Sequence, residues 1–335
     1  MKERKSNRLQ ELLPRRERRG RSPQGLHGWD LEDCAVKAAL DDEASWFRCL
    51  MKMTISRRRR PRRKNDAARA EALLNRIEPM NISACIRRFK TRAPGAATLP
   101  PGLRLYVVGD VHGRLDLLTR LENEIERDLG AAPSNVLTIF VGDYVDRGGD
   151  SRGVIEKLSS DEFCTRFCAL RGNHEQVLLD FLSDASVLEN WRKFGALETL
   201  HSYGVDISHV ARGKGYDLAR SSLIQRMPER HRQFLENTRL SFSSGDYYFC
   251  HAGARPGIAL EHQSDEDLLW IRDDFLAFKG GFGKVVVHGH TPNPTVDMRK
   301  NRINVDTGAY ASGVLTALVL EGETRRILST DSRTR

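Results

Sequence analysis

The stretch Val136-Leu-Thr-Ile-Phe-Val-Gly-Asp-Tyr-Val-Asp-Arg-Gly148 joins an apolar run, typical of a buried strand, to a polar loop that begins at Gly142. The same order occurs before it, where Leu103–Val108 is followed by Gly109-Asp-Val-His-Gly113. It occurs again after it, where Phe163–Leu170 runs into Arg171-Gly-Asn-His-Glu175. Because α/β sheets place ligands at the carboxyl ends of their strands, we expect these three loops to converge.

Helices are predicted between these strands, and further helices and strands are predicted after them. Residues 115–129 carry apolar side chains at helical spacing, and residues 152–158 also favour a helix, so the alternation predicts βαβ units. Residues 177–240 are mainly helical in pattern and are interpreted as a cap or insertion. Four short strands, separated by tight loops, are predicted in the C-terminal part: Tyr247–Cys250, Val285–Val287, Ile303–Val305 and Leu315–Leu320. We therefore expect a mixed α/β fold, an α+β sandwich of two sheets flanked by helices.

The positive charge of the chain lies in its N-terminal third. The 335 residues have a formal net charge of +9. Residues 1–100 contain 25 Lys and Arg against 12 Asp and Glu, whereas the remainder contains 29 against 33. The net charge is therefore no argument that the whole protein binds nucleic acid. We expect two parts: a basic extension and linker at residues 1–99, and a folded catalytic domain at residues 100–335.

The extension is expected to be a solvated, disordered tail. Seven basic residues, interrupted by Pro61, lie within Arg57–Lys64, and like charges at that density oppose a packed core. Residues 66–77 favour a helix, and residues 93–102, rich in Pro, Gly and Ala, favour a linker. Contact of this tail with nucleic acid or another anionic surface is the alternative. The natural start is also open, because several methionines precede the domain: Met1, Met51, Met53 and Met80.

Cysteine usage and hydropathy favour a cytoplasmic protein. The six cysteines form no CxxC pair, which is typical of free thiols in a reducing compartment. No segment resembles a signal peptide or reaches the length of a membrane-spanning helix. We therefore expect localisation in the cytoplasm and no membrane span.

The polar residues of the loops are oxygen and nitrogen ligands. Two more apolar runs end in loops with histidine, at His251 and at His288-Gly-His290-Thr-Pro292. Asp, His and Asn without thiolate suit Mn²⁺, Fe or Zn²⁺ better than Cu(I) or an iron–sulfur cluster. Two such ions held close together clamp a phosphoryl group and generate hydroxide at neutral pH. We expect two divalent ions, with Mn²⁺ as the first choice and Fe or Zn²⁺ as alternatives.

The loops follow one another in a specific order: GDVHG at 109–113, GDYVDRG at 142–148, RGNHE at 171–175, HAG at 251–253 and GHTP at 289–292. This order resembles the bacterial serine/threonine phosphoprotein phosphatases of the metallophosphoesterase, or calcineurin-like, superfamily. The resemblance spans roughly residues 103–320. It implies the calcineurin-like architecture and a phosphomonoesterase that is a serine/threonine protein phosphatase. Its substrates would be phosphorylated proteins or small phosphomonoesters.

The resemblance also implies the metal ligands. Asp110 and His112 would bind the first ion, and Asp143 would bridge both ions. The remaining ligands of the second ion would be three residues: Asn173, His251 and His290. A hydroxide activated by the two ions would then attack phosphorus in line.

Other residues are implied to act on the leaving group and the phosphate. His174 would protonate the leaving oxygen, with Asp146 orienting its ring. Arg147 and Arg272 would hold phosphate oxygens as planar, permanently charged forks, and Asn173 would also contact the phosphate.

Several residues close to these loops have more ordinary interpretations. His288 is interpreted as a residue that hydrogen-bonds within its loop, and Glu175 as a residue that secures its loop. Trp191 and Trp270 are interpreted as packing residues rather than substrate platforms.

Two other functions stay open. A symmetrical dinucleoside polyphosphate hydrolase, acting on diadenosine tetraphosphate, would share the architecture. Asp146 and the GHTP loop resemble the protein phosphatases. In the dinucleotide hydrolases, Ala is expected in place of this Asp, and GHW in place of GHTP. A non-catalytic scaffold that docks through its basic tail is the alternative from another class. The preference for Ser/Thr over Tyr phosphate is open as well.

Overall fold

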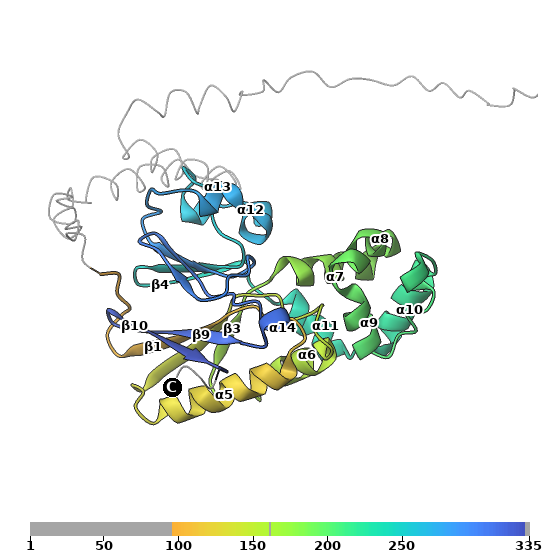
Figure 1. Ribbon diagram of the computed structural model, residues 1–335, viewed down its shortest axis with the longest axis horizontal. Coiled ribbons are helices and arrows are strands. Elements are labelled where there is room, and N and C mark those ends of the chain that lie inside the picture. The colour runs from red at the N-terminus through yellow and green to blue at the C-terminus, as the bar shows by residue number, and fades with distance from the viewer. Residues whose placement is uncertain (1–95, 161, 332–335) are drawn as a thin grey trace, which may run out of the picture. The chain divides into compact units, whose positions relative to one another are not determined.

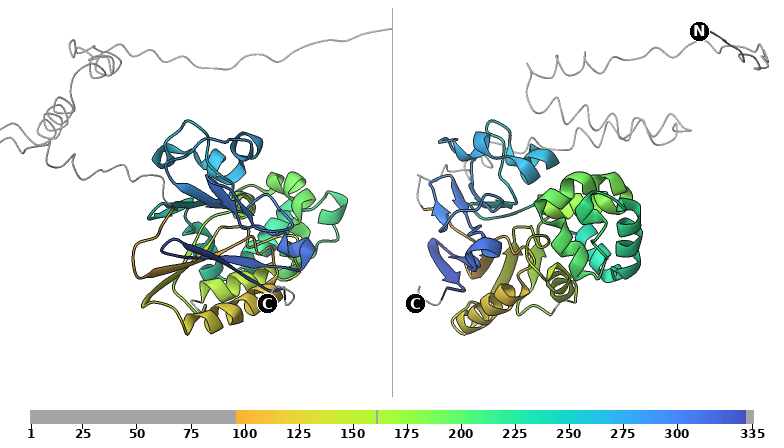
Figure 2. Two further views of the ribbon diagram at one scale, coloured as in Figure 1. Left: turned by 60° about the vertical axis from the view of Figure 1, so that its left-hand side comes forward. Right: turned by 45° about the vertical axis from the view of Figure 1, so that its right-hand side comes forward.

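Two β-sheets packed face to face between helices make up the part of the chain that the computed structural model describes, residues 96–160 and 162–331 (Figures 1 and 2). The predicted α+β sandwich is therefore confirmed. The basic run Arg57–Lys64 and the helix expected at residues 66–77 lie outside the described residues.

The first sheet has five strands in the order β10-β9-β1-β2-β3. Its parallel strands are β1 (Leu103–Val108), β2 (Asn135–Phe140) and β3 (Phe167–Ala169). Its antiparallel strands are β9 (Thr316–Glu321) and β10 (Thr324–Ser329). Two helices connect the parallel strands, α5 (Leu115–Leu129) and α6 (Ser151–Ser159), as the βαβ pattern predicted.

Strand β3 is shorter than the apolar run 163–170 suggested. It holds three residues, Phe167–Ala169. The backbone N–H of Cys164 donates to the Glu122 carboxylate of α5 at 3.0 Å, and Phe163 is buried in the core on the helix side of the sheet. The start of the run is therefore drawn toward α5, and Thr165 and Arg166 contact β2 only through hydrogen bonds to Thr138.

The second sheet also has five strands, in the order β4-β5-β6-β8-β7. They are β4 (Ser241–Ser244), β5 (Tyr247–Cys250), β6 (Val285–His288), β7 (Asp297–Met298) and β8 (Arg302–Asn304). β5, β6 and β8 run parallel, so their carboxyl ends also lie at one edge. The predicted strands at Tyr247, Val285 and Ile303 are thus confirmed within one residue.

Alternation along β1 shows how the layers are built. Leu105 and Val107 point into the core between the sheets, whereas Tyr106 and Val108 point into the core that α5 and α6 cover. Two short helices, α12 (Asp265–Trp270) and α13 (Asp273–Leu276), cover the outer face of the second sheet through residues such as Phe275. Each fully buried side chain of this size contributes about 1.5–3 kcal/mol to stability.

The segment between β3 and β4 is helical, as predicted. Its helices are α7 (Asn173–Ser183), α8 (Leu188–Trp191), α9 (Ala196–Ser202), α10 (Tyr216–Arg226) and α11 (Glu229–Glu236). They lie together beside the sheets (Figure 1), and Leu200, Leu223 and Leu235 are buried in the same core as the helix side of the first sheet. The insertion therefore packs onto the sandwich and is not a separate unit.

Candidate metal centre

The predicted loops meet at the carboxyl ends of β1, β2 and β3. The backbone N–H groups of Val111 and His112 donate to the carbonyl of Asp143 at 3.0 and 2.8 Å, which ties the first loop to the second. The third loop is tied to the second by Glu175, whose carboxylate accepts the N–H groups of Asp143 at 2.8 Å and Tyr144 at 2.7 Å. Glu175 thus secures its loop, as predicted.

Backbone strain is concentrated in these loops. In the described part of the chain, every non-glycine residue with a positive φ is one of the predicted site residues: His112, Asp143, Asp146, Arg147 and His290. A left-handed backbone costs on the order of 1–3 kcal/mol per residue and persists only where the surroundings hold it. The surrounding hydrogen bonds therefore aim these side chains toward one another at some cost in stability.

His112, Asp143 and His174 form one buried group of candidate metal ligands. The Nε2 atom of His112 lies 3.4 Å from Oδ2 of Asp143. Its Nδ1–H donates to the carbonyl of Val145 at 2.8 Å. Because burial lowers the pKa of His112 to about 3, the ring is neutral and Nε2 presents a lone pair to the centre.

Asp143 also belongs to a second buried group, with His251 and His290. The Nε2 atom of His251 lies 3.4 Å from Oδ1 of Asp143 and 2.9 Å from Oδ1 of Asn173. The same Asn173 oxygen lies 2.8 Å from Nδ1 of His290. Asp143 therefore belongs to both groups: Oδ2 faces His112, and Oδ1 faces His251.

The second group brings hydrogen-bond acceptors together. His251 donates its Nδ1–H to the carbonyl of Val141 at 2.9 Å, which leaves a lone pair on Nε2. Burial lowers the pKa of His251, and that of His290 to about 2, so neither ring is charged. At most one proton, on His290 Nδ1, then lies among these facing atoms. Converging carboxylate, amide and imidazole acceptors fit a divalent cation.

Asp110 lies outside both ligand groups of the described residues and close to Asp306, an acid that was not among the predicted site residues. Its Oδ2 accepts the backbone N–H of His290 at 2.9 Å, while Oδ1 is buried without a hydrogen-bond partner. Burial and the charge of Asp306 raise the pKa of Asp110 well above its usual range. Burial and the charge of Asp143 raise the pKa of Asp306 to about 6. Asp306 directly follows the predicted strand at residues 303–305, so the pattern of a polar residue after a strand could have found it.

His174 is held by Asp146, and both side chains are buried. His174 Nδ1 lies 2.6 Å from Oδ2 of Asp146, and because a carboxylate only accepts, Nδ1 carries a proton. Nε2 points to the centre, 3.9 Å from Oδ2 of Asp143. Burial lowers the pKa of His174, but the charges of Asp143 and Asp146 outweigh it and raise that pKa to about 9. The ring can therefore carry a second proton, on Nε2, at neutral pH.

Of the two predicted arginines, Arg147 lies within the centre. Its Nη1 is 2.9 Å from His112 Nε2, its Nη2 is 3.2 Å from His174 Nε2, and its guanidinium lies 4.6 Å from the centroid of the Tyr310 ring. The contact with His174 is a hydrogen bond only when Nε2 carries no proton. Arg272 is exposed, and its charge contributes to the lowered pKa of the nearby His290.

Comparison with known proteins agrees with this geometry. Residues 103–315 match the calcineurin-like phosphoesterase family. This chain belongs to that family. The predicted resemblance is thus confirmed, and the protein is a phosphoester hydrolase of a family that binds a dinuclear metal centre.

Three relatives of this phosphoesterase illustrate the range of the family. Serine/threonine-protein phosphatase 1 of Salmonella typhimurium is 30% identical over 218 residues, covering 63% of this chain and 89% of the relative. Serine/threonine-protein phosphatase 2 of Escherichia coli is 25% identical over 222 residues, covering 63% and 90%. The asymmetrical bis(5′-nucleosyl)-tetraphosphatase PrpE of Anoxybacillus flavithermus is 25% identical over 232 residues, covering 63% and 88%.

Of the two tryptophans interpreted as packing residues, Trp191 packs in the core of this phosphoesterase and Trp270 does not. Trp191 is buried, but its Nε1–H donates to Oδ2 of Asp146 at 2.6 Å. Trp270 is 42% exposed, and its ring centroid lies 6.4 Å from that of His290. His288 hydrogen-bonds within its loop, as predicted: its Nδ1 lies 3.0 Å from the carbonyl oxygen of Gly289. It lies outside both ligand groups of the described residues.

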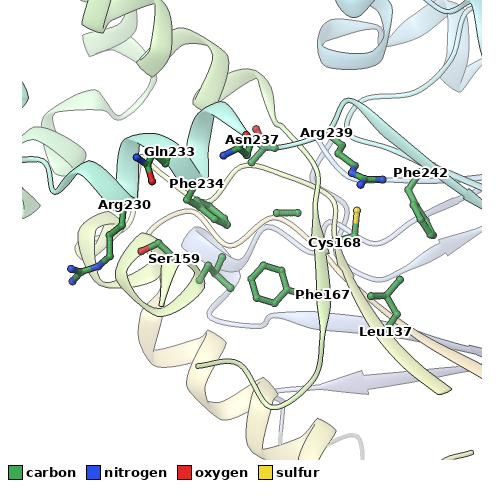
Figure 3. Close-up of a pocket in the computed structure, with 13 residues that line it drawn as sticks. Leu137, Ser159, Phe167, Cys168, Arg230, Gln233, Phe234, Asn237, Arg239 and Phe242 are labelled. Carbon is green, nitrogen blue, oxygen red and sulfur yellow. The ribbon is translucent and has the colours of Figure 1, made fainter. Parts of the chain in front are cut away.

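A pocket of about 520 Å³ lies beside β3, α6 and α11 (Figure 3). Apolar side chains such as Phe167 and Phe234 line it, together with Arg230 and Arg239. None of the predicted site residues lines this pocket.

Among the described residues, no helix has the length and apolar character needed to cross a membrane.

Proposed function

We propose that this phosphoesterase is a serine/threonine protein phosphatase that requires two divalent metal ions. The proposal is carried by the His174–Asp146 pair, joined at 2.6 Å beside the candidate metal ligands. Serine and threonine leave as alkoxides, strong bases that need a proton in the transition state. A nucleotide leaves as a phosphate, a much weaker base, so a buried proton donor of this kind favours a phosphoprotein substrate.

The proposed ligands of the first ion are Asp110, His112 and Asp143, and Asp143 would also bind the second ion. The proposed remaining ligands of the second ion are Asn173, His251 and His290. Two divalent ions there would polarise the phosphoryl oxygens and supply hydroxide at neutral pH. Mn²⁺ is our first choice, and Fe or Zn²⁺ also suits this set of oxygen and nitrogen atoms.

The protein's own groups bind phosphate and donate the proton. Arg147 now contacts the lone pair of His112, which a bound ion would take up, and its guanidinium would then be free to bind two phosphate oxygens. Once Arg147 has moved, Nε2 of His174 can carry the proton that passes to the leaving oxygen. We also assign Arg272 and Asn173 to phosphate binding.

A second candidate is hydrolysis of dinucleoside tetraphosphates. It is favoured by the similarity to the PrpE tetraphosphatase, which spans 88% of that relative. The candidate stays open for this chain because the same metal centre could act on either phosphate.

The experiment measures phosphate or nucleotide release by protein stripped with chelator and reloaded with Mn²⁺, Fe²⁺ or Zn²⁺. Its substrates are a phosphoserine peptide, a phosphotyrosine peptide, p-nitrophenyl phosphate and diadenosine tetraphosphate. We expect metal-dependent release from the phosphoserine peptide and little cleavage of the dinucleotide. Cleavage of the dinucleotide alone would replace our proposal with the second candidate, and inactivity on all four would favour a non-catalytic scaffold.

We also propose that the enzyme is cytoplasmic. The cysteines that the structure describes, Cys164, Cys168 and Cys250, are free thiols, which suits a reducing compartment. Contact between the basic residues Arg57–Lys64 and nucleic acid or another anionic surface is kept only as the alternative to a solvated tail.

A further inference from the structure

Asp146 receives hydrogen bonds on both carboxylate oxygens from the helical insertion. Its side chain has no solvent exposure. The Nε1–H of Trp191 donates to Oδ2 at 2.6 Å, and the hydroxyl of Thr199 donates to Oδ1, also at 2.6 Å. Because Oδ2 also accepts the Nδ1–H of His174, the two oxygens have different partners, and the carboxylate has one preferred orientation.

The insertion also holds the backbone beneath this carboxylate. Asp146 and Arg147 are consecutive residues with left-handed φ angles of 73° and 66°. The N–H of Asp146 donates to the hydroxyl of Thr199 at 2.8 Å, and the N–H of Arg147 donates to the carbonyl of Gly195 at 3.2 Å. A Cβ atom at Gly195 would lie 2.5 Å from the Arg147 nitrogen, so this close approach requires glycine. Residues 191–199 therefore stabilise a turn that the chain would not adopt by itself.

We propose that Trp191 and Thr199 are positioning residues of the phosphatase reaction. They keep Oδ2 of Asp146 directed at Nδ1 of His174, so that Nε2 of His174 is aimed at the leaving oxygen. The inference rests on the proposed function, in which His174 is the proton donor. Packing alone does not account for these contacts, because packing needs only the bulk of the Trp191 ring, whereas its N–H is directed at Oδ2 of Asp146.

Comparing substrates with different leaving groups distinguishes a loss of His174 positioning from general damage to the fold or the metal centre. Serine is a poor leaving group and needs the proton, whereas p-nitrophenolate is a good leaving group and needs it much less. Loss of orientation should therefore lower kcat on a phosphoserine peptide selectively. A disturbed fold or metal centre should lower kcat on both substrates together.

The test compares Trp191→Phe, Thr199→Val and Thr199→Ser with the wild type, all in the full chain loaded with Mn²⁺. The first two variants should lower kcat on the phosphoserine peptide by about 10- to 100-fold, part of what a general acid contributes, with p-nitrophenyl phosphate affected much less. KM and the bound manganese should stay unchanged. Thr199→Ser keeps the hydroxyl and should restore kcat.

Two matched controls perturb packing without touching Asp146. Phe181→Leu alters the ring that packs on Trp191, with centroids 5.3 Å apart. Thr238→Val removes a buried hydroxyl that donates to the carbonyl of Leu235 and accepts from Nε of Arg171. Neither control should change the ratio of kcat values on the two substrates. If Phe181→Leu shifts that ratio as much as Trp191→Phe does, the role of Trp191 is packing and the inference fails.

His174→Asn separates failure of this inference from failure of the proposed function. It should show the same selective loss, and Trp191→Phe added to it should have no further effect, because both act through one proton donor. Wild-type protein inactive on the phosphoserine peptide would overturn the proposed function. Selective loss in His174→Asn, with equal losses on both substrates in Trp191→Phe and Thr199→Val, would overturn only the positioning role.

Discussion

The carboxylate of Asp143 lies between the two groups of candidate ligands. Its oxygens are each 3.4 Å from a histidine nitrogen, of His112 on one side and His251 on the other. Its backbone also joins the loops, because its carbonyl accepts two N–H groups of the first loop and its own N–H donates to Glu175. The backbone contacts do not depend on the side chain, so the electrostatic role can be tested separately.

Asp143→Asn should abolish most of the activity and weaken metal binding. The amide has nearly the same shape but lacks the negative charge that two cations would share. We expect kcat to fall by at least about 100-fold and the bound metal to fall below two ions per chain. Metal analysis after dialysis and circular dichroism would check this. Unchanged metal content with near wild-type kcat would contradict the bridging role.

At the level of elements, Asp128 ties α5 to the first sheet. Its Oδ2 accepts bonds from the hydroxyl of Tyr106 at 2.6 Å, Arg104 at 3.0 Å and Arg326 at 2.8 Å. These partners lie on β1 and β10, so one carboxylate near the end of the helix contacts two strands. Burial raises the pKa of Asp128, but Arg326, Tyr106 and Arg104 outweigh it and hold this pKa below its usual range.

Asp128→Asn should lower the free energy of unfolding by about 1–3 kcal/mol at pH 7, because it weakens the hydrogen bonds from Tyr106 and two arginines, while Arg104 keeps its ion pair with Glu321. A carboxyl group with a lowered pKa stabilises the fold above its unfolded pKa, and this contribution is lost as the pH falls through the folded pKa. The difference between variant and wild type should therefore shrink toward pH 3.

Urea unfolding at several pH values measures this difference. The control is Glu124→Gln on the same helix, which removes an ion pair with the exposed Arg127 and should cost less than about 1 kcal/mol. A difference for Asp128→Asn that stays constant from pH 7 to pH 3 would show that its charge is not responsible.

At the scale of the whole molecule, the candidate centre joins the two sheets. Asp110, Asp143 and Asn173 follow strands of the first sheet, whereas His251 and His290 follow β5 and β6 of the second. A metal ion bound between them would connect both halves of the sandwich. Without the ion, burial raises the pKa of Asp110 well above its usual range and that of Asp306 to about 6, so their ionised forms are destabilised.

Removal of the metal should therefore lower the melting temperature. At a metal concentration 100 times Kd the stabilisation is about 2.7 kcal/mol, which corresponds to about 5–10 °C for a domain of this size. A carboxyl group with a raised pKa binds protons more tightly in the folded state, so metal-free protein loses stability as the pH rises from about 4 to about 6.

Calorimetry with and without chelator should show that the difference in melting temperature widens over this pH range. The metal content must be measured in the same samples. An equal melting temperature for loaded and metal-free protein would contradict a metal site between the sheets.

The predicted site residues all lie between Asp110 and His290, far along the chain from the basic extension. We therefore expect deletion of residues 1–79 to change kcat on p-nitrophenyl phosphate by no more than about two-fold. Steady-state kinetics of the full chain and the shortened chain measure this. A large loss of kcat would show that the extension contributes to the catalytic domain.

The sequence by itself determined the layout of the sandwich and most of the site. Buried strands require apolar runs, and a polar Asp, His or Asn directly after such a run is therefore visible without a structure. Parallel strands then bring these ends to one edge, which is why Asp110, Asp143 and Asn173 could be expected to converge. His251 and His290 follow strands of the second sheet, and the family resemblance placed them in the same site. The helix at Leu115–Leu129 was predicted to the residue because its apolar stripe has a clear period.

Only the tertiary structure showed what holds the site in place. Trp191 and Thr199 reach Asp146 across 45 and 53 residues of chain, and nothing in their local sequence indicates the direction of an N–H or a hydroxyl. The contact of Arg147 with Tyr310 likewise depends on how two distant loops fold. A pattern of apolar and polar residues shows which side chains are buried, but the partner of a buried hydrogen-bonding group is decided by packing in three dimensions.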